Sequence, residues 1–297
     1  MKKKDSYKEY LISIAAPSGP FDRQAFQKGV RELENVGLKV KFEKGIFSRR
    51  AYLAGEDKRR AGELNRALQD KKSKALLFAR GGYGCQRILP LLRGRPHPKV
   101  VVGSSDLTVL LAYLWKCYRL PSYYGPMVAP HLILQKNARR LARVLSDPTY
   151  FQKQRLVAKK KLTTAAPGRS VQGRLVGGCL SLVIATLGTP WEIDTRGSIL
   201  FLEDTNEPPY KVDRMLTQLE QAGKLRGVRG IVLGTFRRGR TLFPSEIETV
   251  FRDCLRNFTG PVLWGLRFGH CPDPLFIPVG RMGRIVGKNL HIVEKTL

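Results

Sequence analysis

Ser105 is the side chain whose setting best suits nucleophilic chemistry. The predicted strand 99–102, Lys-Val-Val-Val, is followed by Gly103-Ser104-Ser105-Asp106 and then by a helical pattern. A serine on a sharp strand-to-helix turn is exposed, and the adjacent N–H groups and helix dipole can stabilise an oxyanion. The pattern is not the Gly-x-Ser-x-Gly motif of α/β-hydrolases, and a helix-capping role for these residues is the alternative.

A general base has to come from four histidines. His97 lies in a Pro-His-Pro turn, His131 starts an apolar helix where a core role suits it, and His291 alternates within a terminal strand. His270 lies in a loop after an apolar strand, which is where bases are usually carried. His270 is therefore the candidate base, with an ordinary turn position as the alternative.

Two acids and a glycine-rich turn complete the candidate chemistry. Glu203 and Asp204 end the apolar run 198–202. An acid there could orient an imidazole, whereas an ion pair at the surface would contribute only about 0–1 kcal/mol. The run Arg-Gly-Gly-Tyr-Gly at 80–84 lets a backbone approach a ligand and could supply an oxyanion amide. A dinucleotide fingerprint fits poorly, because Arg87 replaces its third glycine.

The elements that must position these residues alternate along the first half of the chain. Short apolar runs at 11–15, 75–78 and 100–102 predict buried strands, and amphipathic patterns at 23–36 and 59–70 predict helices. Each of these strands ends in a turn. The alternation predicts a parallel α/β layer with its site at the carboxyl ends of the strands.

The second half contains further short apolar runs. We predict an N-terminal α/β domain at 1–130, a basic connector at 131–170 and a C-terminal β-rich domain at 171–297. The strands predicted in the last segment are 198–202, 230–233, 262–266, 275–279, 285–286 and 291–293.

The charge balance is strongly positive. The 297 residues carry 53 Lys and Arg against 24 Asp and Glu, a net charge of +29. Residues 71–191 hold 21 basic side chains and two acids, Asp106 and Asp147, while residues 192–220 hold seven acids. This balance favours an anionic partner, with nucleic acid first and a small anionic substrate or membrane surface second. A general solubility bias is the alternative.

Several classes of protein are excluded or disfavoured. The five cysteines are odd in number and form no Cys-x-x-Cys pair, which indicates reduced thiols and neither a disulfide framework nor a zinc site. No apolar run reaches the roughly 18 residues of a membrane span. The basic residues at 1–4 are followed by Asp5 and Glu9, which favours a first strand over a signal peptide. We expect a cytoplasmic protein.

Motifs spread over most of the chain together identify a resemblance. They are Ala16–Gly19, Arg80–Gly84, Gly103–Thr108, Gly125–Val128, Gly173–Leu180, Leu187–Pro190, Leu200–Asp204, Tyr210–Leu216 and Gly269-His270. With these motifs the sequence resembles the serine-type LD-carboxypeptidases (muramoyltetrapeptide carboxypeptidases, peptidase family S66). Two positions differ from the family pattern: Ser104 replaces an aromatic residue, and Tyr124 replaces the histidine of His-Gly-Pro.

The resemblance implies a fold and a set of roles. The fold would be a flavodoxin-like N-terminal domain and a C-terminal β-rich α+β domain, with the active site between them. Ser105 would be the nucleophile, His270 the base and Glu203 the orienting acid. The amides of Asp106 and Gly82 would form the oxyanion hole. The resemblance implies a homodimer, and no metal or cofactor is expected.

The activity implied is hydrolysis of the amide between meso-diaminopimelate and terminal D-Ala in cytoplasmic murein tetrapeptides, during cell-wall recycling. Arg80 and Arg87 are candidate clamps for the carboxylates of this anionic muropeptide, because guanidinium groups bind carboxylates bidentately. One alternative is hydrolysis of aminoacyl or peptidyl nucleotides, as in the microcin-C immunity peptidases of the same family. Nucleic-acid binding ranks last, because aromatic residues do not interleave with the basic clusters.

Overall fold

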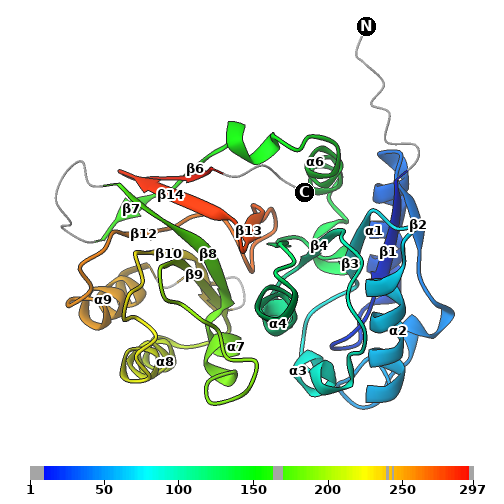
Figure 1. Cartoon of the computed structure of the whole chain (residues 1–297), viewed down its shortest axis with the longest axis horizontal. Coiled ribbons are helices and arrows are strands. Elements are labelled where there is room, and N and C mark those ends of the chain that lie inside the picture. Colours follow the sequence, from blue (N-terminus) through cyan, green and yellow to red (C-terminus); the bar gives the residue numbers. More distant parts are fainter. Residues whose placement is uncertain (1–9, 163–169, 239–240, 243, 294–297) are drawn as a thin grey trace, which may run out of the picture.

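The computed structural model describes residues 10–162, 170–238, 241–242 and 244–293. These residues form two lobes, each built on its own sheet (Figure 1). The helix α4 (Thr108–Tyr118) lies between the lobes and faces the second sheet. The other helices are α1 (Arg23–Asn35), α2 (Asp57–Gln69), α3 (Cys85–Ile88), α5 (Val128–His131), α6 (Gln135–Ser146), α7 (Leu180–Ala185), α8 (Pro209–Gln221) and α9 (Pro244–Cys254).

The first sheet has the strand order β13-β5-β4-β3-β1-β2. Its strands β1 to β5 are parallel, and their order is that of flavodoxin-like folds. Strands β1, β3 and β4 are almost entirely buried, as expected for apolar runs covered on both faces. The bounds are β1 (Leu11–Ala15), β2 (Lys39–Lys41), β3 (Ala75–Phe78), β4 (Val100–Gly103), β5 (Ser122–Tyr124) and β13 (Ile277–Val279).

The second sheet has the order β6-β15-β14-β8-β9-β10-β12-β7, with β11 paired to β10. Strands β8, β9, β10 and β12 are parallel, and the flanking strands are antiparallel. The predicted α/β class and the β-rich second lobe are confirmed. The bounds are β6 (Arg155–Val157), β7 (Lys160–Lys161), β8 (Val171–Cys179), β9 (Ser198–Thr205), β10 (Gly230–Arg238), β11 (Thr241–Leu242), β12 (Val262–Trp264), β14 (Met282–Val286) and β15 (Asn289–Ile292).

The two lobes exchange chain segments. Strand β13 comes late in the sequence but pairs antiparallel with β5 in the first sheet. Within the segment predicted as a basic connector, α6 packs on α1, and β6 and β7 pair with opposite edges of the second sheet. The described part of this segment is therefore built into both lobes.

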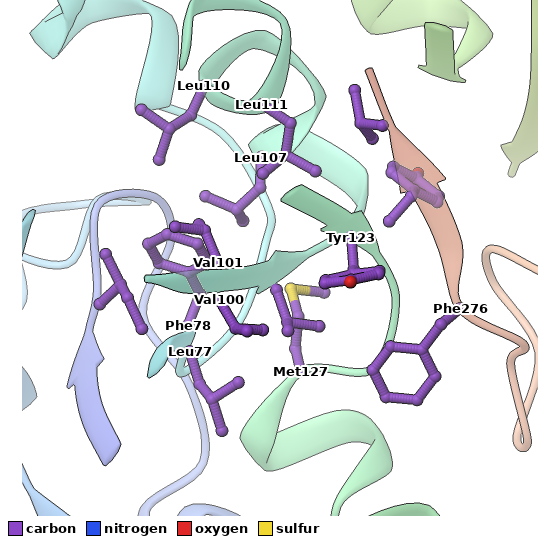
Figure 2. Packing of buried hydrophobic residues seen from close by; sticks show 14 of the residues in the cluster. Leu77, Phe78, Val100, Val101, Leu107, Leu110, Leu111, Tyr123, Met127 and Phe276 are labelled. Atoms are coloured by element: carbon purple, nitrogen blue, oxygen red, sulfur yellow. The ribbon is translucent and has the colours of Figure 1, made fainter. Parts of the chain in front are cut away.

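A single hydrophobic core continues from one lobe into the other. It contains Phe78 of β3 together with Phe201 and Phe268 from the second lobe. A second cluster, which includes Leu200 and Leu216, packs the other face of the second sheet against its helices. Figure 2 shows the first core around β3, β4 and α4, with Tyr123 of β5 beside the chain that carries Phe276. Packing of this kind fixes the lobes against each other.

Two sequence expectations have structural counterparts. All five cysteines are free thiols. In the described ranges, no helix has the length and apolar character needed to cross a membrane.

Candidate active site

Ser105 occupies a strained turn between β4 and α4. Its φ is +60°, in the left-handed region that costs a non-glycine residue about 1–3 kcal/mol. Two hydrogen bonds hold the turn: the Ser105 amide donates to the Tyr124 hydroxyl at 2.8 Å, and Thr108 Oγ1 donates to the Ser105 carbonyl at 2.7 Å. Ser104, by contrast, is buried and extended. Of the two serines, Ser105 is therefore the one whose backbone strain is maintained by specific contacts.

Glu203 and His270 form a close pair at the carboxyl end of β9. The ring nitrogen Nδ1 of His270 lies 2.8 Å and 3.1 Å from the two carboxylate oxygens, and the His270 amide donates to Oε2 at 3.0 Å. Glu203 is fully buried. Burial alone would lower the pKa of His270, but the charge and hydrogen bond of Glu203 outweigh it and raise that pKa. The carboxylate therefore fixes the ring and leaves Nε2 as the nitrogen that can accept a proton.

Tyr124 connects this pair to Ser105. Its hydroxyl accepts from the Ser105 amide and donates to Glu203 Oε1 at 2.5 Å. Burial, followed by the nearby Glu203 charge, raises the pKa of this phenol well above its usual value, so it remains a donor. The chain from Ser105 through Tyr124 and Glu203 to His270 thus crosses from the first sheet to the second. Sequence reasoning noted Tyr124 as a departure from the family but did not assign it this contact.

The glycine turn after β3 lies directly against the nucleophile. A Cβ at Gly81 would lie 2.7 Å from Ser105 Cβ, 2.9 Å from its Oγ and 3.4 Å from the Asp106 amide nitrogen. The predicted oxyanion donor Gly82 has φ +107° and packs on Gly19. The buried Asp106 carboxylate accepts from the Cys85 amide at 2.8 Å, which ties the two turns together. The glycine turn and the nucleophile turn therefore lie in direct contact, with no room for a side chain at Gly81.

A fully buried arginine supports the same turn. Arg60 on α2 donates through Nη1 to the carbonyls of Pro17 and Gly84, the latter at 2.8 Å, and pairs with Asp57 at 2.5 Å. It joins the ends of β1 and β3 at the site, and the helical pattern of α2 gave no sign of this role. Burial raises the pKa of the Asp106 carboxyl, and the positive charge of Arg60 opposes this rise only in part.

A threonine ties the nucleophile turn to the second lobe. Thr108 Oγ1, which donates to the Ser105 carbonyl, also accepts from the Cys179 amide at 3.0 Å. Cys179 ends β8, next to Glu203 on β9 in the strand register. The two lobes are therefore hydrogen-bonded to each other within the site itself.

The two candidate clamp arginines have different surroundings. Arg80 lines a 540 Å³ pocket beside Gly82 together with Arg49, Tyr52 and Tyr83, and donates to the Pro20 carbonyl at 2.8 Å. Arg87 lies outside that pocket lining and pairs with Asp57 at 2.9 Å. The exposed rings of Tyr52 and Tyr83 lie 5.8 Å apart at this pocket.

His131 has the core role that its sequence suggests. Its Nδ1 accepts from the Met127 amide at 3.0 Å, and burial lowers its pKa to about 4, so it stays neutral. Over the residues that the structure covers, no three His, Cys, Asp or Glu side chains are grouped to hold a metal ion. The arrangement thus offers a serine, a histidine and an acid for acyl transfer.

Comparison with known proteins identifies the family of the chain. The models of the LD-carboxypeptidase N-terminal and C-terminal domains match residues 12–125 and 172–285. The chain is 36% identical over 281 residues to the probable murein peptide carboxypeptidase of Bacillus subtilis, covering 91% of this chain and 86% of the relative. The chain belongs to the S66 family of LD-carboxypeptidases. The N-terminal match contains strands β1 to β5 of the first sheet, and the C-terminal match contains β8 to β12 and β14 of the second sheet together with β13.

Solved structures and a second relative extend the comparison. The crystal structure of muramoyltetrapeptide carboxypeptidase from Oxalobacter formigenes matches with a TM-score of 0.81 and 28% identity, covering 97% of this chain and all of the other. The microcin C7 self-immunity protein MccF of Escherichia coli is 26% identical over 323 residues, covering 97% of this chain and 93% of that protein. The chain is thus similar both to a muramoyltetrapeptide carboxypeptidase and to a microcin self-immunity protein.

Proposed function

We propose that this protein is a serine carboxypeptidase that releases the terminal D-alanine from murein tetrapeptides. The observation that carries the proposal is the hydrogen-bonded chain from the strained Ser105 through Tyr124 and Glu203 to His270. The named activities of the relatives in Bacillus subtilis and Oxalobacter formigenes supply the substrate class.

The reaction proceeds through an acyl-enzyme. Ser105 Oγ attacks the carbonyl of the diaminopimelate–D-Ala amide, while His270 Nε2 takes the hydroxyl proton and passes it to the leaving amine. Glu203 stabilises the imidazolium that forms. The amides of Asp106 and Gly82 bind the oxyanion, and a water molecule activated by His270 then hydrolyses the ester.

The pocket beside Gly82 is the proposed substrate entrance. Arg80 lies at this pocket and is proposed to contact a carboxylate of the anionic peptide. Arg87 is already paired with Asp57 and would have to exchange that partner to take part.

We further propose that the enzyme acts in the cytoplasm, in cell-wall recycling, as a homodimer. Light scattering on the purified protein tests the dimer, and fractionation of cells tests the location.

The activity is tested by incubating the purified protein with the tetrapeptide and measuring D-Ala by mass spectrometry. We expect release by the wild type, none above background by Ser105→Ala, and near wild-type release by the matched variant Ser104→Ala. An inactive wild type contradicts the peptidase proposal. Activity in Ser105→Ala, or its loss in Ser104→Ala alone, contradicts the choice of nucleophile.

A second candidate substrate is an aminoacyl or peptidyl nucleotide. It is favoured by the exposed pair Tyr52 and Tyr83 beside the glycine turn, which offers aromatic faces to a nucleobase. Competition between the tetrapeptide and an aminoacyl nucleotide decides between them. The substrate with the higher kcat/KM is the physiological class, and Tyr52→Ala should lower kcat/KM selectively for the nucleotide if that class is correct.

A further inference from the structure

A second cavity lies in the seam between the lobes, away from the candidate catalytic residues. It has a volume of 880 Å³ and is lined by the last turns of α4 and by the amino ends of β8 and β9. Figure 1 shows α4 facing β8 across this seam. Ser105 precedes α4 and Arg119 follows it, so at about 1.5 Å per residue Arg119, at the far end of the cavity, lies about 20 Å from the nucleophile, and Ala112, at the near end, about 10 Å.

Basic side chains from both lobes converge on this cavity. Among the described residues that line it, Asp194 is the only acid, and it contacts Arg196 at 3.4 Å. The basic residues of the lining are Lys116, Arg119, Arg174, Arg196 and Arg229. Like charges that share one concave wall raise the local positive potential and favour entry of an anion.

Trp115 orders two of these guanidinium groups. The Cζ atoms of Arg119, from the first lobe, and of Arg174, from the second, each lie 5.3 Å from its ring centroid. Arg174 also donates to the Gly280 carbonyl at 2.9 Å. Stacking restricts both side chains before any ligand arrives, and the hydrogen bond restricts Arg174 further, so less side-chain entropy is lost on binding. Two guanidinium groups held in place on opposite lobes can donate to the same anion together.

The shape of the site narrows the class of ligand. A basic surface that binds nucleic acid presents an extended groove with several aromatic platforms, whereas here the positive groups line one partly open cavity, and Trp115 is the single aromatic residue among its described lining residues. Lys116 is held back from the anion by its bonds to the Pro190 and Glu192 carbonyls at 2.9 Å and 3.0 Å. The arginines therefore carry the recognition, and guanidinium groups select phosphoryl and carboxylate oxygens.

We propose that this interlobe cavity binds a compact polyanion that carries phosphoryl or carboxylate groups. The ligand contacts Arg119 of the first lobe and Arg174 and Arg229 of the second at the same time. Because these contacts exist only when the lobes are in place, binding stabilises their arrangement, and with it the hydrogen bond between Thr108 and the Cys179 amide. This site is independent of the substrate pocket and does not rest on the proposed peptidase activity.

The test titrates the purified full-length protein with sodium pyrophosphate, and separately with citrate, by calorimetry at constant ionic strength. We expect saturable binding with one site per chain and a rise in the thermal midpoint with ligand concentration. Pyrophosphate and citrate distinguish phosphoryl from carboxylate recognition. Trp115→Phe should remove most of the change in tryptophan fluorescence that accompanies binding.

Matched charge variants locate the site. Arg119→Gln combined with Arg229→Gln should weaken binding at least tenfold, while Arg139→Gln combined with Arg256→Gln removes the same charge from exposed positions outside the cavity and should leave it unchanged. Equal weakening by both pairs overturns the proposal in favour of nonspecific charge. Absence of saturable binding to both anions also overturns it, as does binding that requires an oligonucleotide.

Discussion

At the scale of single residues, the candidate site depends on the hydrogen bonds that one buried carboxylate, Glu203, accepts. Glu203 accepts from the His270 ring and amide and from the Tyr124 hydroxyl, and it is wholly shielded from water. A buried carboxylate with several donors is firmly placed, and the loss of any donor leaves an oxygen unsatisfied. The pH behaviour of His270 and the position of Ser105 therefore both depend on Glu203.

Replacing this acid should change the pH profile as well as the rate. A base has to be neutral, so activity falls as the pH drops through the pKa of His270, which Glu203 keeps raised. Glu203→Gln removes the negative charge, lowers that pKa and moves the acid limb of kcat/KM to lower pH. The maximum should drop by about 10³–10⁴-fold, by analogy with other triads. An unshifted acid limb, measured from pH 5 to 9, would show that His270 is not the titrating base.

Tyr124→Phe tests the bridge between the lobes. The change removes the donor to Glu203 and the acceptor of the Ser105 amide, which should cost about 1–3 kcal/mol of stability and lower kcat at least tenfold with little change in KM. Denaturant unfolding and steady-state kinetics measure the two effects. Tyr123→Phe, at the neighbouring buried tyrosine, is the matched control and should keep near wild-type kcat.

At the scale of elements, three turns at the ends of β1, β3 and β4 form one unit. Arg60 joins the first two through the Pro17 and Gly84 carbonyls, and Asp106 joins the last two through the Cys85 amide. The unit leaves room for no side chain at Gly81. The close approach of the Ser105 side chain, and not a positive φ, is what requires glycine at that position.

Gly81→Ala should block the site. The new methyl group would lie 2.7 Å and 2.9 Å from Ser105 Cβ and Oγ, so the nucleophile turn has to shift. A misplacement of this kind should lower kcat/KM by about 10²-fold or more. Gly62→Ala in α2 is the control, where the neighbouring Arg66 side chain is flexible and alanine favours the helix. Wild-type kinetics in Gly81→Ala would contradict the tight contact.

The sequence predicted local elements well because their causes are local. The apolar runs of β1, β3 and β4 and the polar turns after them were sufficient to place Ser105 at the end of a parallel strand. The pairing of β13 with β5 has no local signature, because the partners are some 150 residues apart. The contacts of Tyr124 with Ser105 and Glu203 were not predicted for the same reason, because these partners lie on separate elements. The catalytic roles of Ser105, Glu203 and His270 stay predictions.

At the scale of the whole molecule, the positive charge acquires a more specific interpretation. The basic residues of the acid-poor segment 71–191 include Lys116, Arg119 and Arg174, which line the interlobe cavity. Arg80, from the same segment, lines the pocket beside the glycine turn. Part of the excess positive charge thus lines the interlobe cavity and the pocket beside the glycine turn, and the remainder has no structural explanation.

The N-terminal lobe should not fold well by itself. A fragment of residues 1–130 lacks β13, so the edge of β5 and the surface that Phe201 and Phe268 cover would be exposed. We expect this fragment to aggregate or to elute as large species in size-exclusion chromatography, with the full chain as control. A monomeric fragment with cooperative unfolding would show that the lobe is an independent folding unit.

The crossing of β13 has a consequence for how the protein is made. During translation, strand β5 leaves the ribosome about 150 residues before its partner Ile277–Val279 is synthesised. At roughly 5–20 residues per second, the nascent chain spends on the order of ten seconds or more with an open sheet edge. Chaperones that recognise extended apolar segments have that interval in which to act. Gene fission between the lobes would also be disfavoured, since neither product would carry a complete first sheet.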